Sequence, residues 1–275
     1  MKIINGKEIA NKILDRLEPD ILELRKKGII PTLAVILVGD DQSSEIYVKN
    51  KRKIFEEMGL GFKLFAFEKF DQEKVADLIN KLNDDPKIQG ILVQSPIPGT
   101  GDQKAILSLV DSSKDVDCLN PKNISEMHSP VLKAILRVVR EMKIDIKKSK
   151  IVIVGKGELI GKPFSKILKE KKAKFQVVDK DTKNKKQILG EADLVISAVG
   201  QPGVLKIVDL KNGVSLIDAG GGIKAGKTVG DFIWQGQNIF REVSKVPGGI
   251  GPITIAFLVE NLLILAKQQV SEKRL

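Results

Sequence analysis

The chain has 275 residues, 42% hydrophobic and 29% charged, enough for one large domain or two ordinary ones, each with a core. Its net charge is +11, but the 46 basic residues are interleaved with 35 acidic ones, which argues against a nucleic-acid-binding stripe. One cysteine excludes an intramolecular disulfide, and one cysteine with one histidine cannot form a zinc cluster without carboxylates. Because neither an uninterrupted apolar run of about 18 residues nor a signal-type N-terminus is apparent, we expect a cytoplasmic protein without a membrane or metal partner.

The first half of the chain alternates between helical and strand-like patterns. Asp71 is placed to cap a helix, and Pro86 ends that helix. Pro19 interrupts another helical pattern in its middle. Between Asp111 and Pro130 lies a polar segment without a strong period, whose length favours a functional loop. In chain order, we expect helices at 7–27, 44–58, between 71 and 86, and at 104–110, and strands at 32–38, 63–67 and 88–93.

The second half resembles a further series of strands and helices. We expect helices at 131–142 and 253–267, strands at 151–154, 174–178, 192–199 and 214–217, and a rigid glycine-proline loop at 247–252. The strands end at glycine or at an acid followed by glycine, which is typical of a parallel sheet whose carboxyl edge binds a ligand. The sequence therefore predicts a two-domain α/β protein, with the boundary in the helix at 131–142.

The segment 150–164, KIVIVGKGELIGKPF, has the pattern of a strand, a tight turn and a helix. Gly155, Gly157 and Gly161 allow the main chain to approach a pyrophosphate at the positive end of that helix. The last interval is one residue longer than in the common dinucleotide fingerprint. The pattern indicates a nucleotide site, and the alternative is a glycine-tolerant turn in a parallel α/β protein.

Two segments carry groups suited to proton chemistry. Tyr47 and Lys51 are four residues apart on a predicted helix, so the phenol and the amine share one face. A solvated basic helix is the alternative interpretation. Asp115 and Asp117 lie in the polar segment after Asp111, where turn formation is the alternative to a chemical role.

Seven segments, in their order and near-family spacing, resemble the bifunctional methylenetetrahydrofolate dehydrogenase/methenyltetrahydrofolate cyclohydrolases: SSEIYVKNKRK, GILVQSPIP, KDVDCLNPKN, VIVGKGELIGKPF, ADLVISAVGQP, LIDAGGG and VPGGIGPITIAFLVEN. The resemblance spans almost the whole chain. It implies an N-terminal α/β catalytic domain at 1–135, a Rossmann-type parallel-sheet domain that binds NADP at 136–252, and a C-terminal helix at 253–275 that returns to the catalytic domain. It also implies a folate substrate in the cleft between the domains and a homodimer.

The resemblance assigns roles to individual residues. Lys51 would be the catalytic amine, Gln94 its hydrogen-bond partner, Tyr47 the ring beside the folate, and Asp117 the acid that holds the pterin. An amine crowded by cations and enclosed by a ligand can lose its proton near neutrality, which suits Lys51 to this role. Substrate-binding residues would be Tyr47, Val93, Gln94, Ser95, Asp117, Pro247, Gly248, Gly249 and Gly251. Cofactor-binding residues would be Gly155, Lys156, Gly157, Lys180, Ser129, Gly221 and Thr254.

Three departures from the family pattern affect these roles. Cys118 stands where the family usually has glycine, which should stiffen the loop that carries Asp117. The chain is shortened after Asn123, and the proline-cysteine-threonine-proline segment of the family is reduced to His128-Ser129-Pro130, in which the serine keeps a hydroxyl. Lys156-Gly157 replaces the usual arginine-serine pair, so the phosphate contacts of the cofactor are changed.

The cofactor prediction rests on opposing charges. Asp179, at the end of the second Rossmann strand, is placed to bind ribose hydroxyls and favours NAD. Lys156 and Lys180 lie where the family contacts the extra ribose phosphate and favour NADP. We predict NADP, with NAD as the alternative.

The implied activity is oxidation of 5,10-methylenetetrahydrofolate with NADP, followed by hydrolysis of the methenyl product to 10-formyltetrahydrofolate, in one-carbon metabolism and purine biosynthesis. A monofunctional dehydrogenase is the alternative among enzymes. A basic nucleic-acid-binding protein on a Rossmann-like scaffold is the alternative from another class, but one tryptophan and one tyrosine provide poorly for base stacking.

Overall fold

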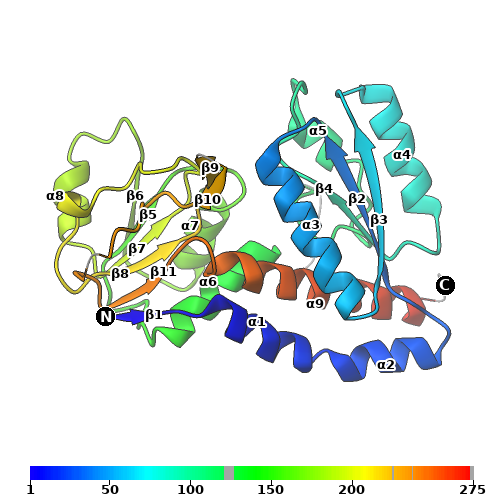
Figure 1. The fold of residues 1–275 in the computed structure, drawn as a ribbon, viewed down its shortest axis with the longest axis horizontal. Coiled ribbons are helices and arrows are strands. Elements are labelled where there is room, and N and C mark those ends of the chain that lie inside the picture. The colour runs from blue at the N-terminus through cyan, green and yellow to red at the C-terminus, as the bar shows by residue number, and fades with distance from the viewer. Residues whose placement is uncertain (121–126, 225, 237, 273–275) are drawn as a thin grey trace. The chain divides into compact units, whose positions relative to one another are not determined.

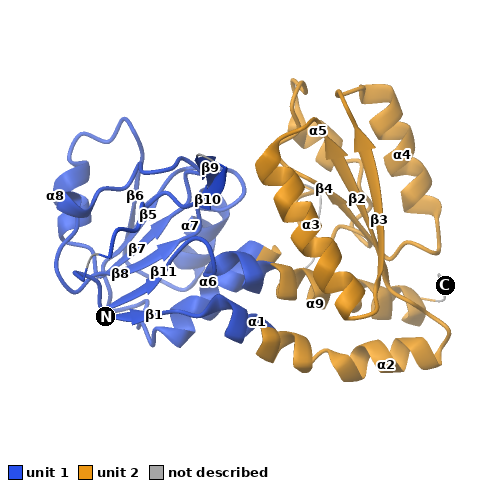
Figure 2. Cartoon of the chain, viewed as in Figure 1, with its two compact units in different colours: residues 1–10, 131–254 blue, residues 11–130, 255–275 orange. Residues whose placement is uncertain are grey.

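The computed structural model describes residues 1–120, 127–224, 226–236 and 238–272 (Figure 1). The shortened segment after Asn123 therefore lies outside the described residues. The chain divides into two compact units, one of residues 11–130 and 255–275 and one of residues 1–10 and 131–254 (Figure 2). Each unit is built on its own parallel sheet, so the expected two-domain α/β class is confirmed.

A three-stranded sheet organises the unit of residues 11–130 and 255–275. Its strands are β2 (Thr32–Val38), β3 (Gly61–Phe67) and β4 (Gly90–Val93), in the order β3-β2-β4. The central strand β2 is an uninterrupted apolar run, as expected for a strand covered on both faces. Three helices follow the strands and begin at aspartate caps, which accept hydrogen bonds from backbone N–H groups of the first turn: α3 (Gln42–Glu57), α4 (Gln72–Asp84) and α5 (Gln103–Leu107).

Helical segments from both ends of the chain, within residues 11–26 and 255–271, complete this unit. The helical pattern at 7–27 forms α1 (Gly6–Asp15) and α2 (Glu18–Lys26), and the break falls where Pro19 occupies the first turn of α2, as predicted. Among the described residues, only α9 (Ile250–Ser271) is long and apolar enough to span a membrane. Most of it is buried within the protein, as is typical of a core helix.

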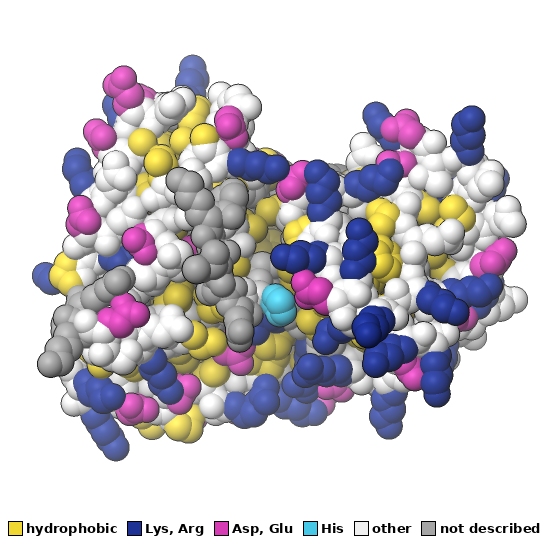
Figure 3. Space-filling view, turned by 180° about the vertical axis from the view of Figure 1, so that it is seen from behind, with side chains coloured by type: hydrophobic (Ala, Val, Ile, Leu, Met, Phe, Trp, Pro, Cys, Tyr) yellow, Lys and Arg dark blue, Asp and Glu magenta, His cyan; other side chains and the backbone are white. Residues whose placement is uncertain are grey.

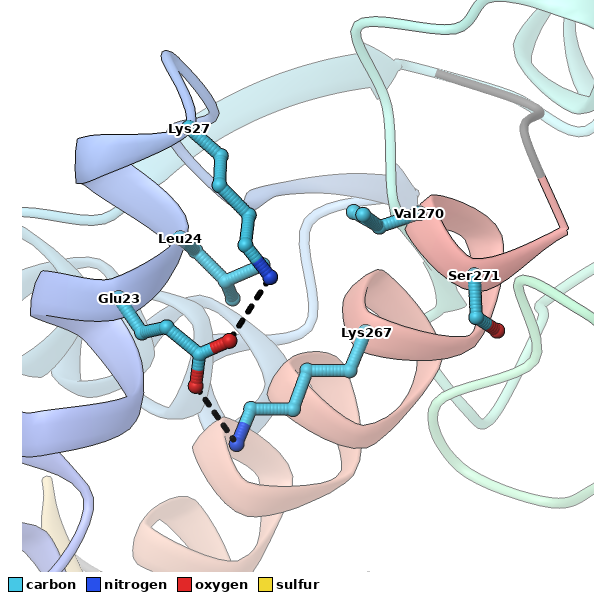
Figure 4. A pocket seen from close by; sticks show the side chains of 6 residues that line it. All are labelled: Glu23, Leu24, Lys27, Lys267, Val270 and Ser271. Carbon is cyan, nitrogen blue, oxygen red and sulfur yellow. Dashed lines mark hydrogen bonds and ion pairs between the residues drawn. The ribbon is translucent and has the colours of Figure 1, made fainter.

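Helices α2 and α9 border a groove of about 270 Å³ (Figure 4). Its polar rim is largely paired internally, since Glu23 accepts a hydrogen bond from Lys27 at 2.8 Å and lies 3.9 Å from Lys267. The groove contains none of the predicted site residues. Its lining is Glu23, Leu24, Lys27, Lys267, Val270 and Ser271.

A six-stranded parallel sheet organises the other unit. Its order is β1-β11-β8-β7-β5-β6, formed by β1 (Lys2–Ile3), β11 (Glu242–Ser244), β8 (Ser215–Asp218), β7 (Leu194–Ser197), β5 (Ile151–Val154) and β6 (Phe175–Val178). The chain leaves β5 for β6 on one side and then returns to β7 on the other. The carboxyl end of β5 is therefore the topological switch point, where open α/β sheets bind their ligands.

Shorter elements surround this sheet. The helices are α6 (Pro130–Glu141), α7 (Gly161–Glu170), α8 (Lys185–Gly190) and the 3-10 turn at Ile207–Asp209, and a hairpin is formed by β9 (Gly222–Lys224) and β10 (Lys227–Val229). A buried apolar cluster joins β5, β6, β7 and β8 to residues such as Leu205, Phe232 and Phe240. The strands are thus held mainly by aliphatic packing, as the scarcity of aromatic residues predicts, and an aromatic group of Phe232, Trp234 and Phe240 adjoins them.

The structure differs from the expected boundaries at several places: the strand expected at 192–199 is limited to Leu194–Ser197 and the helix expected at 104–110 to Gln103–Leu107, and two further differences concern the ends of the chain. Residues 1–10 do not join the unit of residues 11–130, because β1 pairs in parallel with β11, with Lys2 opposite Glu242. A two-residue strand has no recognisable period, so this pairing could not be seen in the sequence. The last helix begins at Ile250 instead of residue 253, which places Gly251 and Pro252 in its first turn, where proline is tolerated.

Candidate active site and cofactor site

Lys51 lies on the inward face of α3. Ser44, Val48, Lys51 and Phe55 are buried at helical intervals along this helix, and Lys51 is only 6% exposed. Lys49, in contrast, is exposed on another face of the same helix. The solvated-helix interpretation is therefore wrong for Lys51, which the helix carries into the interior because it follows the apolar stripe.

The Lys51 ammonium has two partners. Its Nζ donates a hydrogen bond of 2.9 Å to Gln94 Oε1 and lies 5.4 Å from the centroid of the Tyr47 ring. Gln94 follows β4 directly and extends it by donating its backbone N–H to Ile36 O. The structure thus brings together three predicted residues, two from α3 and one from the carboxyl end of the sheet.

The turn after Gln94 is held by a residue that sequence reasoning missed. Gln103, at the start of α5, donates from Nε2 to Ser95 Oγ at 3.2 Å and accepts at Oε1 from Ile97 N at 3.1 Å. Gln94 Nε2 in turn donates to Ser95 O at 3.0 Å. Gln103 therefore supports the turn that orients Gln94, and no pattern in the sequence distinguishes it from other polar residues.

Burial shifts the pKa values of Lys51 and Asp117 toward each other. Burial lowers the pKa of Lys51, and the negative charge of Asp117 acts in the opposite direction. Burial raises the pKa of Asp117 to about 6; the charge of Lys51 opposes this shift, and the charge of Asp115 adds to it. An amine and a carboxyl group that both titrate closer to neutrality are suited to exchange protons with a substrate.

The loop that carries Asp117 is anchored on both sides. Asp115 accepts a hydrogen bond from Asn120 N at 2.9 Å, so it acts in part as the turn former of the alternative interpretation. Asn261, buried on α9, donates to Val116 O at 2.9 Å and to His128 O at 3.2 Å. Cys118 has a φ of 54°, the left-handed conformation that the glycine usual at this position adopts without strain. Cys118 therefore adopts a conformation that glycine reaches more easily, and the stiffening expected of this substitution stays a prediction.

The glycine turn after β5 is sterically determined at two of its three glycines. Gly155 has a φ of 107°, and a Cβ there would lie 2.7 Å from Ala198 O. A Cβ on Gly161 would overlap Gly155 O. A Cβ on Gly157, however, would meet open space, so packing within the protein does not require a glycine at this position. Packing thus explains Gly155 and Gly161.

Lys156 is paired with the acid expected to bind ribose hydroxyls. Its Nζ lies 2.7 Å from Asp179 Oδ2, and Asp179 Oδ1 accepts a hydrogen bond from Thr182 Oγ1 at 2.8 Å. The bonds from Lys156 and Thr182 hold the pKa of Asp179 at about 2. Lys180, the next residue, is exposed. Lys156 thereby neutralises a carboxylate that would repel a ribose phosphate.

The other predicted cofactor residues occupy different environments. Gly221 is exposed after β8, where its carbonyl would lie 3.8 Å from a Cβ on Gly200. Ser129, in the unit of residues 11–130, has a buried hydroxyl without a hydrogen-bond partner among the described residues. Thr254 donates its hydroxyl to Ile250 O at 3.1 Å within α9. The roles of these three residues stay predictions.

The glycine-proline loop before α9 packs tightly against the start of α1. Gly6 donates its N–H to Gly248 O at 2.8 Å, and a Cβ on Gly249 would overlap Ser244 Oγ. Pro247 and Gly248 are exposed, with Gly248 at a φ of 95°. Gly249 is thus required by packing, whereas Pro247 and Gly248 present main chain to solvent. Contact of this loop, and of Val93 or Gly251, with a substrate stays a prediction.

Comparison with known proteins identifies the family. The model of the tetrahydrofolate dehydrogenase/cyclohydrolase catalytic domain matches residues 4–117, and the model of the NAD(P)-binding domain of the same enzymes matches residues 129–270. The chain belongs to the tetrahydrofolate dehydrogenase/cyclohydrolase family. The expected resemblance is therefore confirmed.

Individual members of this family match over nearly their whole length. The bifunctional protein FolD of Acetivibrio thermocellus is 36% identical, over 99% of each chain. The FolD structure from Campylobacter jejuni is 34% identical, with a TM-score of 0.89 over 98% of this chain and 99% of that one. The FolD structure from Trypanosoma brucei, complexed with NADP cofactor and inhibitor, is 30% identical, with a TM-score of 0.86 over 98% of each chain.

Proposed function

We propose that the protein is a bifunctional enzyme that oxidises 5,10-methylenetetrahydrofolate with NADP and hydrolyses the methenyl product to 10-formyltetrahydrofolate. The observation that carries this proposal is the hydrogen bond between the buried Lys51 and the partly buried Gln94, with the partly buried Asp117 close enough to shift the lysine's pKa. Hydride removal alone does not require such a pair. The presence of the Lys51–Gln94 pair supports a second, proton-dependent step and therefore favours the bifunctional enzyme over a monofunctional dehydrogenase.

The dehydrogenase step asks little of the protein beyond positioning. NADP, when bound at the turn after β5, supplies the hydride acceptor. The lone pair of the folate nitrogen stabilises the methenyl cation as the hydride leaves, so no protein proton is needed. Gly155, Lys156 and Lys180 would bind and orient the cofactor. These residues fit that role, because Gly155 forms the positive-φ turn at the switch point and Lys156 pairs with Asp179.

The cyclohydrolase step uses Lys51. In its neutral form, favoured by burial, the amine takes a proton as water adds to the methenyl carbon. The resulting ammonium returns a proton to the ring nitrogen as the carbon–nitrogen bond breaks, and the hydroxyl proton leaves to solvent to give the formyl group. Gln94 Oε1 accepts from Lys51 and fixes the direction of the amine. Asp117, ionised above a pH of about 6, would accept hydrogen bonds from the donor edge of the pterin.

A two-channel assay tests this function. The protein is mixed with methylenetetrahydrofolate and either NADP or NAD, while reduced nicotinamide and methenyl product are followed separately. We expect NADP to be reduced faster than NAD, and supplied methenyltetrahydrofolate to be hydrolysed faster than in buffer. Nicotinamide reduction without hydrolysis would establish the monofunctional alternative, and neither rate above background would refute the proposal.

Assembly and location are part of the same proposal. We infer a cytoplasmic homodimer, supported by the family resemblance, and light scattering after size-exclusion chromatography should give twice the chain mass of 30.2 kDa. Nucleic acid is not expected as a partner. On the face shown in Figure 3, basic side chains are interspersed with acidic and hydrophobic ones. If the protein bound random duplex DNA in a salt-dependent gel-shift assay and bound no cofactor, a nucleic-acid-binding protein would be favoured over the enzyme.

A further inference from the structure

Two buried carboxylates lie beneath the carboxyl edge of the six-stranded sheet, and neither belongs to the sites described so far. Asp218 is the last residue of β8, and Asp231 follows β10. Asp218 is 1% exposed and Asp231 is 0% exposed. Burying charged groups is costly unless their hydrogen bonds are satisfied, so their placement requires a reason.

Asp231 binds one loop at four points. Its Oδ2 accepts hydrogen bonds of 2.7 Å from Ser197 Oγ and from Val199 N, and its Oδ1 accepts one of 2.8 Å from Gln201 N. Its backbone carbonyl accepts a further bond from Leu205 N at 3.0 Å. One residue thus fixes both ends of the segment 197–205, which follows β7.

Asp218 holds Asp231 in turn. Its Oδ1 accepts from Gly220 N at 3.1 Å and from Asp231 N at 3.2 Å, and its Oδ2 accepts from Phe232 N at 2.9 Å. Glycine covers both carboxylates: a Cβ on Gly220 would overlap the Asp231 carboxylate, and a Cβ on Gly230 would overlap that of Asp218. Larger residues would leave no room for this arrangement.

The loop held by Asp231 forms part of the edge at which the cofactor is proposed to bind. A Cβ on Gly155 would lie 2.7 Å from Ala198 O and 3.3 Å from Val199 Cγ2, so the loop adjoins the glycine turn directly. Gly200, at a φ of 77°, approaches Gly221. Val199 is 41% exposed although it is apolar. An exposed valine held rigidly by buried bonds suggests a surface shaped for a ligand.

We propose that Asp231 is a positioning residue for the nicotinamide cofactor: from beneath the sheet edge it holds residues 199–201 against the cofactor, and Asp218 holds Asp231. The inference rests on the proposed function, and it adds a specific prediction. Loss of the Asp231 carboxylate impairs the step that uses the cofactor and spares the hydrolysis, which uses none.

Asp231→Asn tests the proposal in the full-length protein. An amide has one acceptor oxygen where the carboxylate has two, so at least one N–H of the loop loses its partner. We expect NADP binding, measured directly by calorimetry, to weaken roughly 10- to 100-fold, and the KM for NADP to rise in parallel. Hydrolysis of supplied methenyltetrahydrofolate should stay within about twofold of wild type.

Asp193→Asn is the matched control. Asp193 precedes β7 at its other end, where it accepts hydrogen bonds from Lys150 N at 2.8 Å and Lys211 Nζ at 2.6 Å. It should leave NADP binding unchanged. Trp234, the one tryptophan of the chain, stacks on Phe240 near Asp231, so its fluorescence verifies local folding in each variant. If Asp231→Asn does not fold, Ser197→Ala takes its place as the test variant. Ser197→Ala should weaken NADP binding about threefold, because one of the hydrogen bonds to the Asp231 carboxylate is lost.

The outcomes separate the inference from the proposed function. Unchanged NADP affinity in a folded Asp231→Asn protein, or in Ser197→Ala where that variant decides, would overturn the inference, as would an equal loss of hydrolysis. If the variant bound NADP more weakly but the wild type reduced no nicotinamide with methylenetetrahydrofolate, the positioning role of Asp231 would be supported and the proposed function would be refuted.

Discussion

Replacing Lys51 with methionine separates the two proposed reactions. Lys51→Met keeps an unbranched stem of similar length and removes the amine that donates to Gln94 at 2.9 Å. If Lys51 is the acid–base group, hydrolysis of methenyltetrahydrofolate should fall by roughly 100- to 10,000-fold, the range typical of a lost general acid–base catalyst. Dehydrogenation should fall less, since hydride transfer requires no proton from the protein.

The structure also predicts that this variant folds. Lys51 is 6% exposed, and an apolar side chain is favoured over an ammonium in such a place. Against this gain, Gln94 Oε1 loses its donor, which costs about 1 to 3 kcal/mol if water cannot replace it. Gln94 is only partly buried, so water can reach it, and the free energy of unfolding should change by about 1 kcal/mol or less.

The assay follows nicotinamide reduction and methenyl product in one cuvette. In Lys51→Met the methenyl product should accumulate as fast as nicotinamide is reduced and then decay no faster than in buffer. Lys49→Met, an exposed lysine on the same helix, is the control and should retain both rates. Wild-type hydrolysis in Lys51→Met would refute the catalytic role of this amine, whatever its burial.

Three further substitutions test the site. Asp117→Asn should weaken folate binding by about 2 to 3 kcal/mol, because an amide offers only one acceptor to the pterin. In the wild type, the KM for folate should fall as the pH rises through about 6, because the Asp117 carboxyl group then ionises. If Asp117→Asn kept this pH dependence, Asp117 would be excluded as its source. Lys156→Glu places a second carboxylate beside Asp179, so NADP affinity should drop roughly 10- to 100-fold and NAD affinity far less; equal losses, measured by titration, would contradict NADP selectivity. Cys118→Val should lower the free energy of unfolding by about 1 to 2 kcal/mol relative to Cys118→Gly, since a β-branched residue is strained at a φ of 54°; equal denaturant midpoints would argue against strain at this turn.

The carboxyl pKa of Asp117 also has a consequence for stability. A carboxyl pKa raised from 3.8 to about 6 on folding means that the folded protein holds this proton more tightly than the unfolded chain. This contribution to stability is fully present below pH 3.8 and is lost as the pH rises through about 6. Asp117→Asn should therefore lack this loss, and the difference in unfolding free energy between pH 4 and pH 8, measured by denaturant titration, should be smaller than in wild type.

The sequence by itself determined the local structure. Continuous apolar runs predicted the strands at 32–38 and 151–154 to the residue, because a parallel strand buried on both faces needs no alternation. Asp71 marked the start of α4, since a carboxylate at that position satisfies an N–H of the first turn. Helical spacing placed Tyr47 and Lys51 on one face. Each of these features depends on residues only a few positions apart.

Only the tertiary structure decided which groups meet. Helical spacing did not reveal that the Tyr47–Lys51 face turns inward, and the bond from Lys51 to Gln94 joins residues 43 apart in the chain. The hydrogen bond from Ser197 to Asp231 joins residues 34 apart, and β1, at the N-terminus, pairs with β11 near the other end of the sequence. Such contacts depend on how strands are ordered in a sheet and how long loops close. Strand order and loop closure depend on burial and hydrogen bonding across the whole fold, so they cannot be predicted from a local pattern of residues.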